Sequence, residues 1–221
     1  MMMRYVVLVL AVAFLASACQ PAAEAPQRTG SNGEVRSLSP ELLKQLEEVK
    51  NRRKYVSLDL ATLREIKDEH LEPAILDYIF ARIAREPENK KDAVLALPRG
   101  FQSVYLSWLV EAEVLNGGFN QYFWNSSAQF AELTPAALID IGSPEAAQIM
   151  RQAIATANAE SSTMARFRAE GTVEAFVESY KHTKLNDLDD SFSELAEQFR
   201  TLRVRYIRAN ESAFLAGRDA G

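Results

Sequence analysis

The chain has 221 residues, of which 48% are hydrophobic, with 25 basic and 30 acidic side chains and a net charge of −5. This length suits one domain with a sizeable core, and the acidic balance argues against a nucleic-acid-binding surface, which would be basic. With a single cysteine, the chain excludes an internal disulfide framework.

The first 18 residues have the pattern of a signal peptide. Arg4 supplies a small positive region, and Tyr5 to Leu15 form a nearly unbroken apolar run. That run is too short for a membrane span, which needs roughly 20 residues, so a secretory leader is the better interpretation.

The only cysteine, Cys19, directly follows the small residues Ala16-Ser17-Ala18. This arrangement resembles a bacterial lipobox, in which the cysteine is acylated and the leader is cut just before it. We therefore predict a lipidated Cys19 that anchors the protein to a membrane, as an outer-membrane lipoprotein facing the periplasm, since Gln20 and not Asp follows it. Cleavage by an ordinary signal peptidase, which gives a soluble periplasmic protein, is the alternative.

The mature chain is expected to consist of a tether, one domain and a short tail. Residues 19–38, the lipidated cysteine and a segment rich in Pro, Ala, Gln, Gly and Ser, have almost nothing to bury and predict a disordered tether. Residues 39–216 carry the folded domain, and residues 217–221 form the tail.

Helical signals dominate the domain. Helix starts are predicted at Ser or Thr caps and at Pro in a first turn. The last one or two helices are predicted to carry the aromatic residues between 192 and 214. The predicted starts are Ser39-Pro40, Thr62, Pro73, Pro98, Thr134-Pro135, Ser143-Pro144 and Thr172. Only residues 55–60 alternate like a strand, and one short strand has no pairing partner. The prediction is an all-α fold, a single compact helical domain of about seven to nine helices.

The clearest helix is predicted from Pro98 to Leu115. Its apolar residues recur at helical spacing without a miss, which places the helix in the core. They are Phe101, Val104, Tyr105, Trp108, Leu109, Ala112 and Leu115. Gly117-Gly118 is expected to stop the helix with a left-handed cap, and the aromatics that follow predict one or two further turns. Downstream, Thr172 is expected to cap another helix, which carries Val173, Phe176, Val177 and Tyr180.

The segment from Glu113 to Asn125 reads Glu-Val-Leu-Asn-Gly-Gly-Phe-Asn-Gln-Tyr-Phe-Trp-Asn. It resembles the signature of the DNA-mimic protein C-terminal domain family, a domain of unknown function, at every fixed position. Weaker echoes lie at residues 97–100 and 185–192, and the resemblance covers about residues 90–215. It implies an all-helical fold and, through the namesake, an acidic protein that imitates duplex DNA and occupies a transcription factor's basic surface.

Two interpretations of this motif are open. In the first, it is a structural corner: the glycines reverse the chain, the aromatics lock it onto the core, and the carboxamides bond freed backbone groups. In the second, it is a ligand site in which Glu113, Gln121 and Asn125 face a pocket. The corner is the favoured interpretation. The residues concerned are Glu113, Asn116, Gly117, Gly118, Phe119, Gln121, Tyr122 and Asn125.

No catalytic, metal or cofactor site is predicted. His70 and His182 lie more than a hundred residues apart without a cysteine partner, so they do not have zinc spacing. Asp187, Asp189 and Ser191 partly match a calcium loop, but Phe192 replaces the required Gly, and a cluster at a helix start is the better interpretation.

Charge distribution guides the functional hypothesis. Residues 100–199 hold 5 basic and 14 acidic side chains, a local charge of −9. We therefore expect a non-enzymatic protein-binding module that presents an acidic surface to a basic protein or peptide and does not bind nucleic acid. The alternatives are a DNA mimic proper and an enzyme that uses Glu113 with the neighbouring carboxamides.

Overall fold

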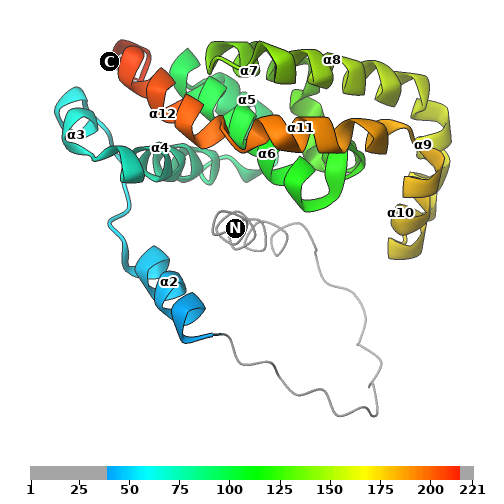
Figure 1. Ribbon diagram of the computed structural model, residues 1–221, viewed down its shortest axis with the longest axis horizontal. Coiled ribbons are helices and arrows are strands. Elements are labelled where there is room, and N and C mark those ends of the chain that lie inside the picture. Colours follow the sequence, from blue (N-terminus) through cyan, green and yellow to red (C-terminus); the bar gives the residue numbers. More distant parts are fainter. Residues whose placement is uncertain (1–38, 215–221) are drawn as a thin grey trace.

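A computed structural model describes residues 39–214, and within this range the fold is all-helical (Figure 1). The α-helices are α2 (Pro40–Asn51), α3 (Leu60–Glu65), α4 (Asp68–Ile83), α5 (Lys90–Leu95), α6 (Arg99–Trp124), α7 (Thr134–Asp140), α8 (Pro144–Ala159), α9 (Ser161–Glu170), α10 (Val173–Ser179), α11 (Asp189–Ala196) and α12 (Phe199–Ala209). Short 3-10 turns link them: η1 (Pro87–Asn89), η2 (Ser126–Leu133), η3 (Tyr180–His182), η4 (Leu185–Leu188) and η5 (Glu211–Phe214).

The all-α prediction is confirmed. Between residues 39 and 214, nine α-helices have seven or more residues and no segment forms a strand; residues 55–59 of the strand-like stretch are irregular, and Leu60 begins α3. None of the helices in this range is long and apolar enough to cross a lipid bilayer. The predicted signal peptide, Cys19, the whole of the tether, residues 215–216 of the predicted domain and the C-terminal tail lie outside the described residues.

The long helix α6 is the centre of the fold. Helices α7 and α8 run along one side of it, α11 and α12 cross in front of it, and α4 packs against its first half (Figure 1). The apolar periodicity read from the sequence accounts for this placement, because the predicted core positions from Phe101 to Ala112 are all buried.

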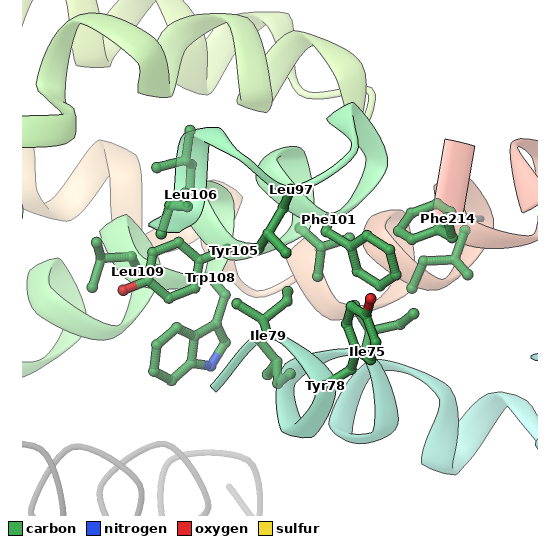
Figure 2. Close-up of a cluster of buried hydrophobic side chains, with 14 of the residues drawn as sticks. Ile75, Tyr78, Ile79, Leu97, Phe101, Tyr105, Leu106, Trp108, Leu109 and Phe214 are labelled. Atoms are coloured by element: carbon green, nitrogen blue, oxygen red, sulfur yellow. The ribbon is translucent and has the colours of Figure 1, made fainter. Parts of the chain in front are cut away.

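One half of the core lies between α4 and the beginning of α6 (Figure 2). The ring of Tyr78 stacks on that of Phe101 with centroids 4.6 Å apart, and Phe214 meets the other side of Phe101 edge-on at 5.2 Å. Burying an aromatic or aliphatic side chain of this size contributes roughly 1.5–3 kcal/mol, so the α4–α6 contact is a main source of stability.

The other half of the core surrounds the end of α6. Phe119 and Tyr122 are fully buried there with Met150 of α8 and the rings of Phe192 and Phe199. Phe192 meets Phe119 edge-on at 5.1 Å and Phe199 at 5.5 Å. Phe192 and Phe199, which were predicted to lie on the last helices, therefore help to build a core that α6, α8, α11 and α12 share.

Two predicted helix starts are wrong. Helix α3 begins at Leu60, because the side chain of Asp59 accepts a hydrogen bond of 2.7 Å from the Thr62 backbone N–H and so caps the helix ahead of Thr62. Helix α4 begins at Asp68 and contains Pro73 in its interior. The buried Leu71 gives the extra turn a core contact that outweighs the one hydrogen bond that proline removes.

Leu115, which the periodicity placed in the core, faces solvent instead, and so do Val173 and Val177 on α10. Leu115 is 43% exposed, Val173 72% and Val177 58%. On α10 the buried positions are the small residues Ala175 and Ser179, whereas Phe176 and Tyr180 are half-buried. A periodic pattern shows that a helix has an apolar face, but it does not show whether that face has a neighbour.

A buried ionic network fixes α12 against α4 and α6. Arg203 is only 1% exposed; its Nε donates to Glu72 at 2.5 Å and its Nη2 donates to Glu111 at 2.5 Å. Glu111 therefore does not contribute to an acidic surface, although it was counted in the acidic middle region. Farther along α12, Arg208 bonds Asp68 at 2.8 Å and the carbonyl groups of Leu63 and Ile66.

Candidate functional site

The two glycines of the motif kink α6 into two helical stretches. Gly117 has φ −156° and ψ 30°, and Gly118 has φ 70° and ψ −178°. The prediction that one of the two adopts a positive φ is confirmed. The predicted left-handed cap is wrong, because the ψ of Gly118 is extended, and this combination of angles is essentially accessible to glycine alone. Beyond the kink the helix resumes with Phe119, as the aromatic spacing predicted.

The restarted helix is capped from a distant part of the chain. The backbone N–H of Phe119 donates to Asp189 Oδ1 at 2.8 Å, and Asp189 is the first residue of α11. A Cβ atom on Gly118 would overlap the carboxylate of Asp189. Burial raises the pKa of Asp189, and the hydrogen bond from Phe119 opposes that rise. Asp189 was predicted only as an acid at the start of its own helix; its role at the kink depends on a tertiary contact that sequence spacing does not reveal.

Side chains from η3 and α10 hold the kink from another direction. The Tyr180 hydroxyl donates to the carbonyl of Gly117 at 2.8 Å. The Asn120 amide, which is buried, donates to the Ser179 hydroxyl at 2.9 Å. Both ends of the kinked peptide are thus hydrogen-bonded to residues some 60 to 70 positions later in the chain.

Glu113 is the centre of the motif's polar cluster. Its carboxylate accepts hydrogen bonds from Gln121 Nε2 at 2.8 Å, Asn125 Nδ2 at 2.9 Å and Ser127 Oγ at 2.5 Å. Asn116 Nδ2 in turn donates to Gln121 Oε1 at 3.0 Å. The expectation that these carboxamides bond the backbone is wrong, because Gln121 and Asn125 donate hydrogen bonds to the Glu113 carboxylate. The structure does bring Glu113, Gln121 and Asn125 together, and it adds Ser127, which sequence reasoning missed.

This cluster fastens the two sides of the kink together. Glu113 precedes the glycines by one helical turn, whereas its three donors all follow them, so each hydrogen bond spans the bend. Hydrogen bonds to an ionised group contribute about 1.5–3 kcal/mol each. The carboxylate has three donors from its own segment, which accounts for the arrangement without an added ligand.

The aromatic residues of the motif differ in burial. Phe119 and Tyr122 are fully buried, and the Tyr122 hydroxyl lies 3.1 Å from Thr134 Oγ1 at the start of α7. Phe123 and Trp124 are only partly buried. Burial, reinforced by the negative charge of Glu113, raises the pKa of Tyr122, and the same two causes raise that of Tyr105.

No candidate metal site is found in the part of the chain that the structure describes. Residues 39–214 contain no group of three or more His, Cys, Asp or Glu side chains placed to hold an ion. His70 lies beside Glu69 and His182 beside Glu178, both at the surface.

Comparison with known proteins identifies the family. No curated protein and no solved structure matches the chain. The family model of DMP19-like proteins, a DNA-mimic family, matches residues 95–210, which include the kink, the Glu113 cluster and Asp189. This match covers more than half of the chain, and the protein therefore belongs to the DMP19-like family.

Proposed function

We propose that the protein is a non-enzymatic protein-binding module that presents an acidic face on η4 and α11 to a basic protein surface. The observation that carries this proposal is a row of four exposed carboxylates, those of Asp187, Asp190, Glu194 and Glu197. None of the four forms an ion pair or side-chain hydrogen bond with a residue between 39 and 214, in contrast to Asp189 beside them.

The row lies on one side of the helix. At 100° per residue, Asp190, Glu194 and Glu197 fall within an arc of about 60°, opposite the side that buries Phe192 and Ala196, and Asp187 precedes them in η4. Because the aromatic core fixes the rotation of α11, its three charges point away from the core together. A rigid acidic face of this kind favours association with a positively charged surface and accelerates the encounter.

The spacing of the charges along this row can be compared with the spacing of phosphates along DNA. With a rise of 1.5 Å per residue, four charges over residues 187–197 give about one charge per 5 Å. Duplex DNA carries one per ~1.7 Å and a single strand one per ~3.4 Å. The row is therefore closer to one strand than to a duplex, which favours a local basic patch as its target.

DNA mimicry proper is the second candidate, and family membership favours it. It would require that the acidic face compete with duplex DNA for the same basic surface. The enzymatic alternative has weaker support, because the Glu113 carboxylate is already engaged by three side-chain donors at the kink.

The test compares two variants of equal charge. In the acidic-face variant, D187N, D190N, E194Q and E197Q remove four carboxylates; in the control, E86Q, E88Q, E132Q and E145Q remove four other exposed carboxylates. Wild type and both variants are used to capture proteins from an envelope extract, and each captured protein is purified and its affinity measured at two salt concentrations.

We expect a basic partner that binds the wild type and the control with similar affinity and binds the acidic-face variant at least tenfold more weakly. Its affinity for the wild type should fall as the salt concentration rises. Displacement of that partner by duplex DNA would favour the DNA-mimic candidate. Equal binding of the partner to both variants would contradict the proposal.

The proposed location is the cell envelope, with the protein held at the outer membrane by a lipid on Cys19. The support is the leader-like sequence that ends at this cysteine. Three acyl chains would exceed the two membrane signals that stable anchoring needs. We predict that C19A moves the protein from the membrane fraction to the soluble periplasmic fraction, measured by fractionation with lipid labelling. A variant that stays in the membrane fraction, together with an unlabelled wild type, would refute the lipid anchor.

A further inference from the structure

Among the side chains that the structure describes, those on the outer side of α10 are, with Val56, the most exposed large hydrophobic ones. Val173 is 72% exposed and Val177 58%, and they are one helical turn apart. Isolated exposed apolar residues are ordinary on a protein surface, but contiguous ones indicate an interaction site.

The two valines continue into an aromatic row. Phe176 and Tyr180 follow Val173 and Val177 by three residues each, so they lie beside the valines. Both rings are half-buried and meet edge-on with centroids 5.2 Å apart. On its other side Phe176 packs against Trp124, the last residue of α6, at 5.0 Å. We call these five residues, Val173, Val177, Phe176, Tyr180 and Trp124, the α10 ridge.

The ridge is anchored on the side that faces the body of the protein. Ser179 receives the Asn120 hydrogen bond and Tyr180 donates to the Gly117 carbonyl, so the kink holds α10 in place. Tryptophan and tyrosine are, with arginine, the side chains most enriched among the residues that dominate binding energy at interfaces. The ridge is therefore a rigid apolar surface and not a frayed helix end.

The charges beside the ridge indicate which partner it fits. The two basic side chains next to its rings are engaged: Arg168 lies over Trp124 and donates to the Phe123 carbonyl, and Lys181 pairs with Glu178 at 2.7 Å. Glu170 and Glu174 are exposed and form no ion pair between residues 39 and 214. The charge that remains for a partner to neutralise is negative.

From this combination we infer that the α10 ridge is a docking site for an amphipathic helix of a partner protein, whose apolar face is bordered by lysine or arginine. The apolar side chains of the partner helix lie along Val173 and Val177, and the basic residues that border them face Glu174. The ridge shares no residue with the acidic face of α11, so the inference does not depend on the function proposed for that face.

The test uses residues 20–221, which contain the whole described fold, and three labelled synthetic peptides. The first is a helix with a leucine face bordered by lysines, the second has glutamates in place of the lysines, and the third is the first peptide scrambled. Binding is measured by fluorescence anisotropy. The variant V173S/V177S removes the apolar ridge, and L95S/I139S removes two other exposed apolar side chains as a control.

We expect the lysine-bordered peptide to bind wild type and L95S/I139S equally, and V173S/V177S at least tenfold more weakly, with all three proteins melting at similar temperatures. The charge reversal E174K should weaken the binding of the lysine-bordered peptide and strengthen the binding of the glutamate-bordered peptide. Equal binding of the scrambled peptide, no loss in V173S/V177S, or no binding at all would overturn the inference. A wild type that sediments as a dimer while V173S/V177S is a monomer would also overturn it, by assigning the ridge to a second copy of the chain.

Discussion

Replacement of Arg203 by methionine is expected to destabilise the protein by about 3–5 kcal/mol, because it leaves the buried Glu111 carboxylate without a paired cation, whereas Glu72 keeps Arg200, whose Nε lies 3.4 Å away. Arg203 is the cation between Glu72 and Glu111, and both carboxylates are nearly inaccessible to solvent. Methionine has a similar length and fills much of the same space, so lost packing is a minor part of the effect. Urea unfolding monitored by circular dichroism measures the loss.

The pH dependence separates this electrostatic cause from a packing defect. In the native protein, burial raises the pKa of Glu111 and the charge of Arg203 opposes that rise. Without Arg203, the pKa of Glu111 should rise further above its value in the unfolded chain. A carboxyl group with a raised pKa binds its proton more tightly in the folded state, so stability increases as pH falls through that pKa. We expect the deficit of the R203M variant to shrink between pH 7 and pH 5.

Two controls sharpen this prediction. E111Q alone should have a small effect, because Arg203 keeps Glu72 as its partner and the amide oxygen still accepts a hydrogen bond. E111Q combined with R203M should be more stable than R203M, since the carboxylate that lost its cation is gone. A deficit that stays constant with pH, together with no recovery in the double variant, would refute the electrostatic explanation.

Replacement of Gly118 by valine is expected to cost about 2–6 kcal/mol through two additive causes. The backbone angles of Gly118 lie in a region that costs other residues about 1–3 kcal/mol. The new side chain would also overlap the Asp189 carboxylate that caps Phe119, and crowding of this kind costs typically 1–3 kcal/mol. Thermal and urea unfolding give the value.

Gly171 provides the matched control for the backbone term. It has φ 65° and ψ 18°, and a Cβ atom there would meet nothing within 4 Å. G171V should therefore cost only about 1–2 kcal/mol, the penalty of a left-handed conformation without crowding. Equal losses at Gly118 and Gly171 would show that the contact with Asp189 contributes nothing.

The sequence was informative where local rules decide the structure. The spacing from Phe101 to Ala112 located the central helix, Thr172 caps α10 as expected, and the paired glycines marked the kink. These features depend on side-chain period, capping chemistry and backbone freedom, each of which acts over a few residues.

The errors have tertiary causes. Glu113 is hydrogen-bonded by carboxamides that spacing alone assigned to the backbone, and Asp189 caps a helix 70 residues away in the chain. Glu111 was counted as surface charge, but Arg203 neutralises it in the interior. Leu115 was expected in the core, but it is 43% exposed, because a periodic pattern does not show whether a neighbouring element covers each position.

The network around Arg203 has a practical consequence for dividing this chain into pieces. The family match begins at residue 95, yet Glu72 and the apolar side of α4 that packs on Phe101 lie before it. A fragment cut at the family boundary would expose half of the core and would lose one of the two acceptors of its buried guanidinium. The stretch by which relatives are recognised is thus shorter than the stretch that folds cooperatively, and a soluble fragment should begin no later than Asp59, the cap of α3.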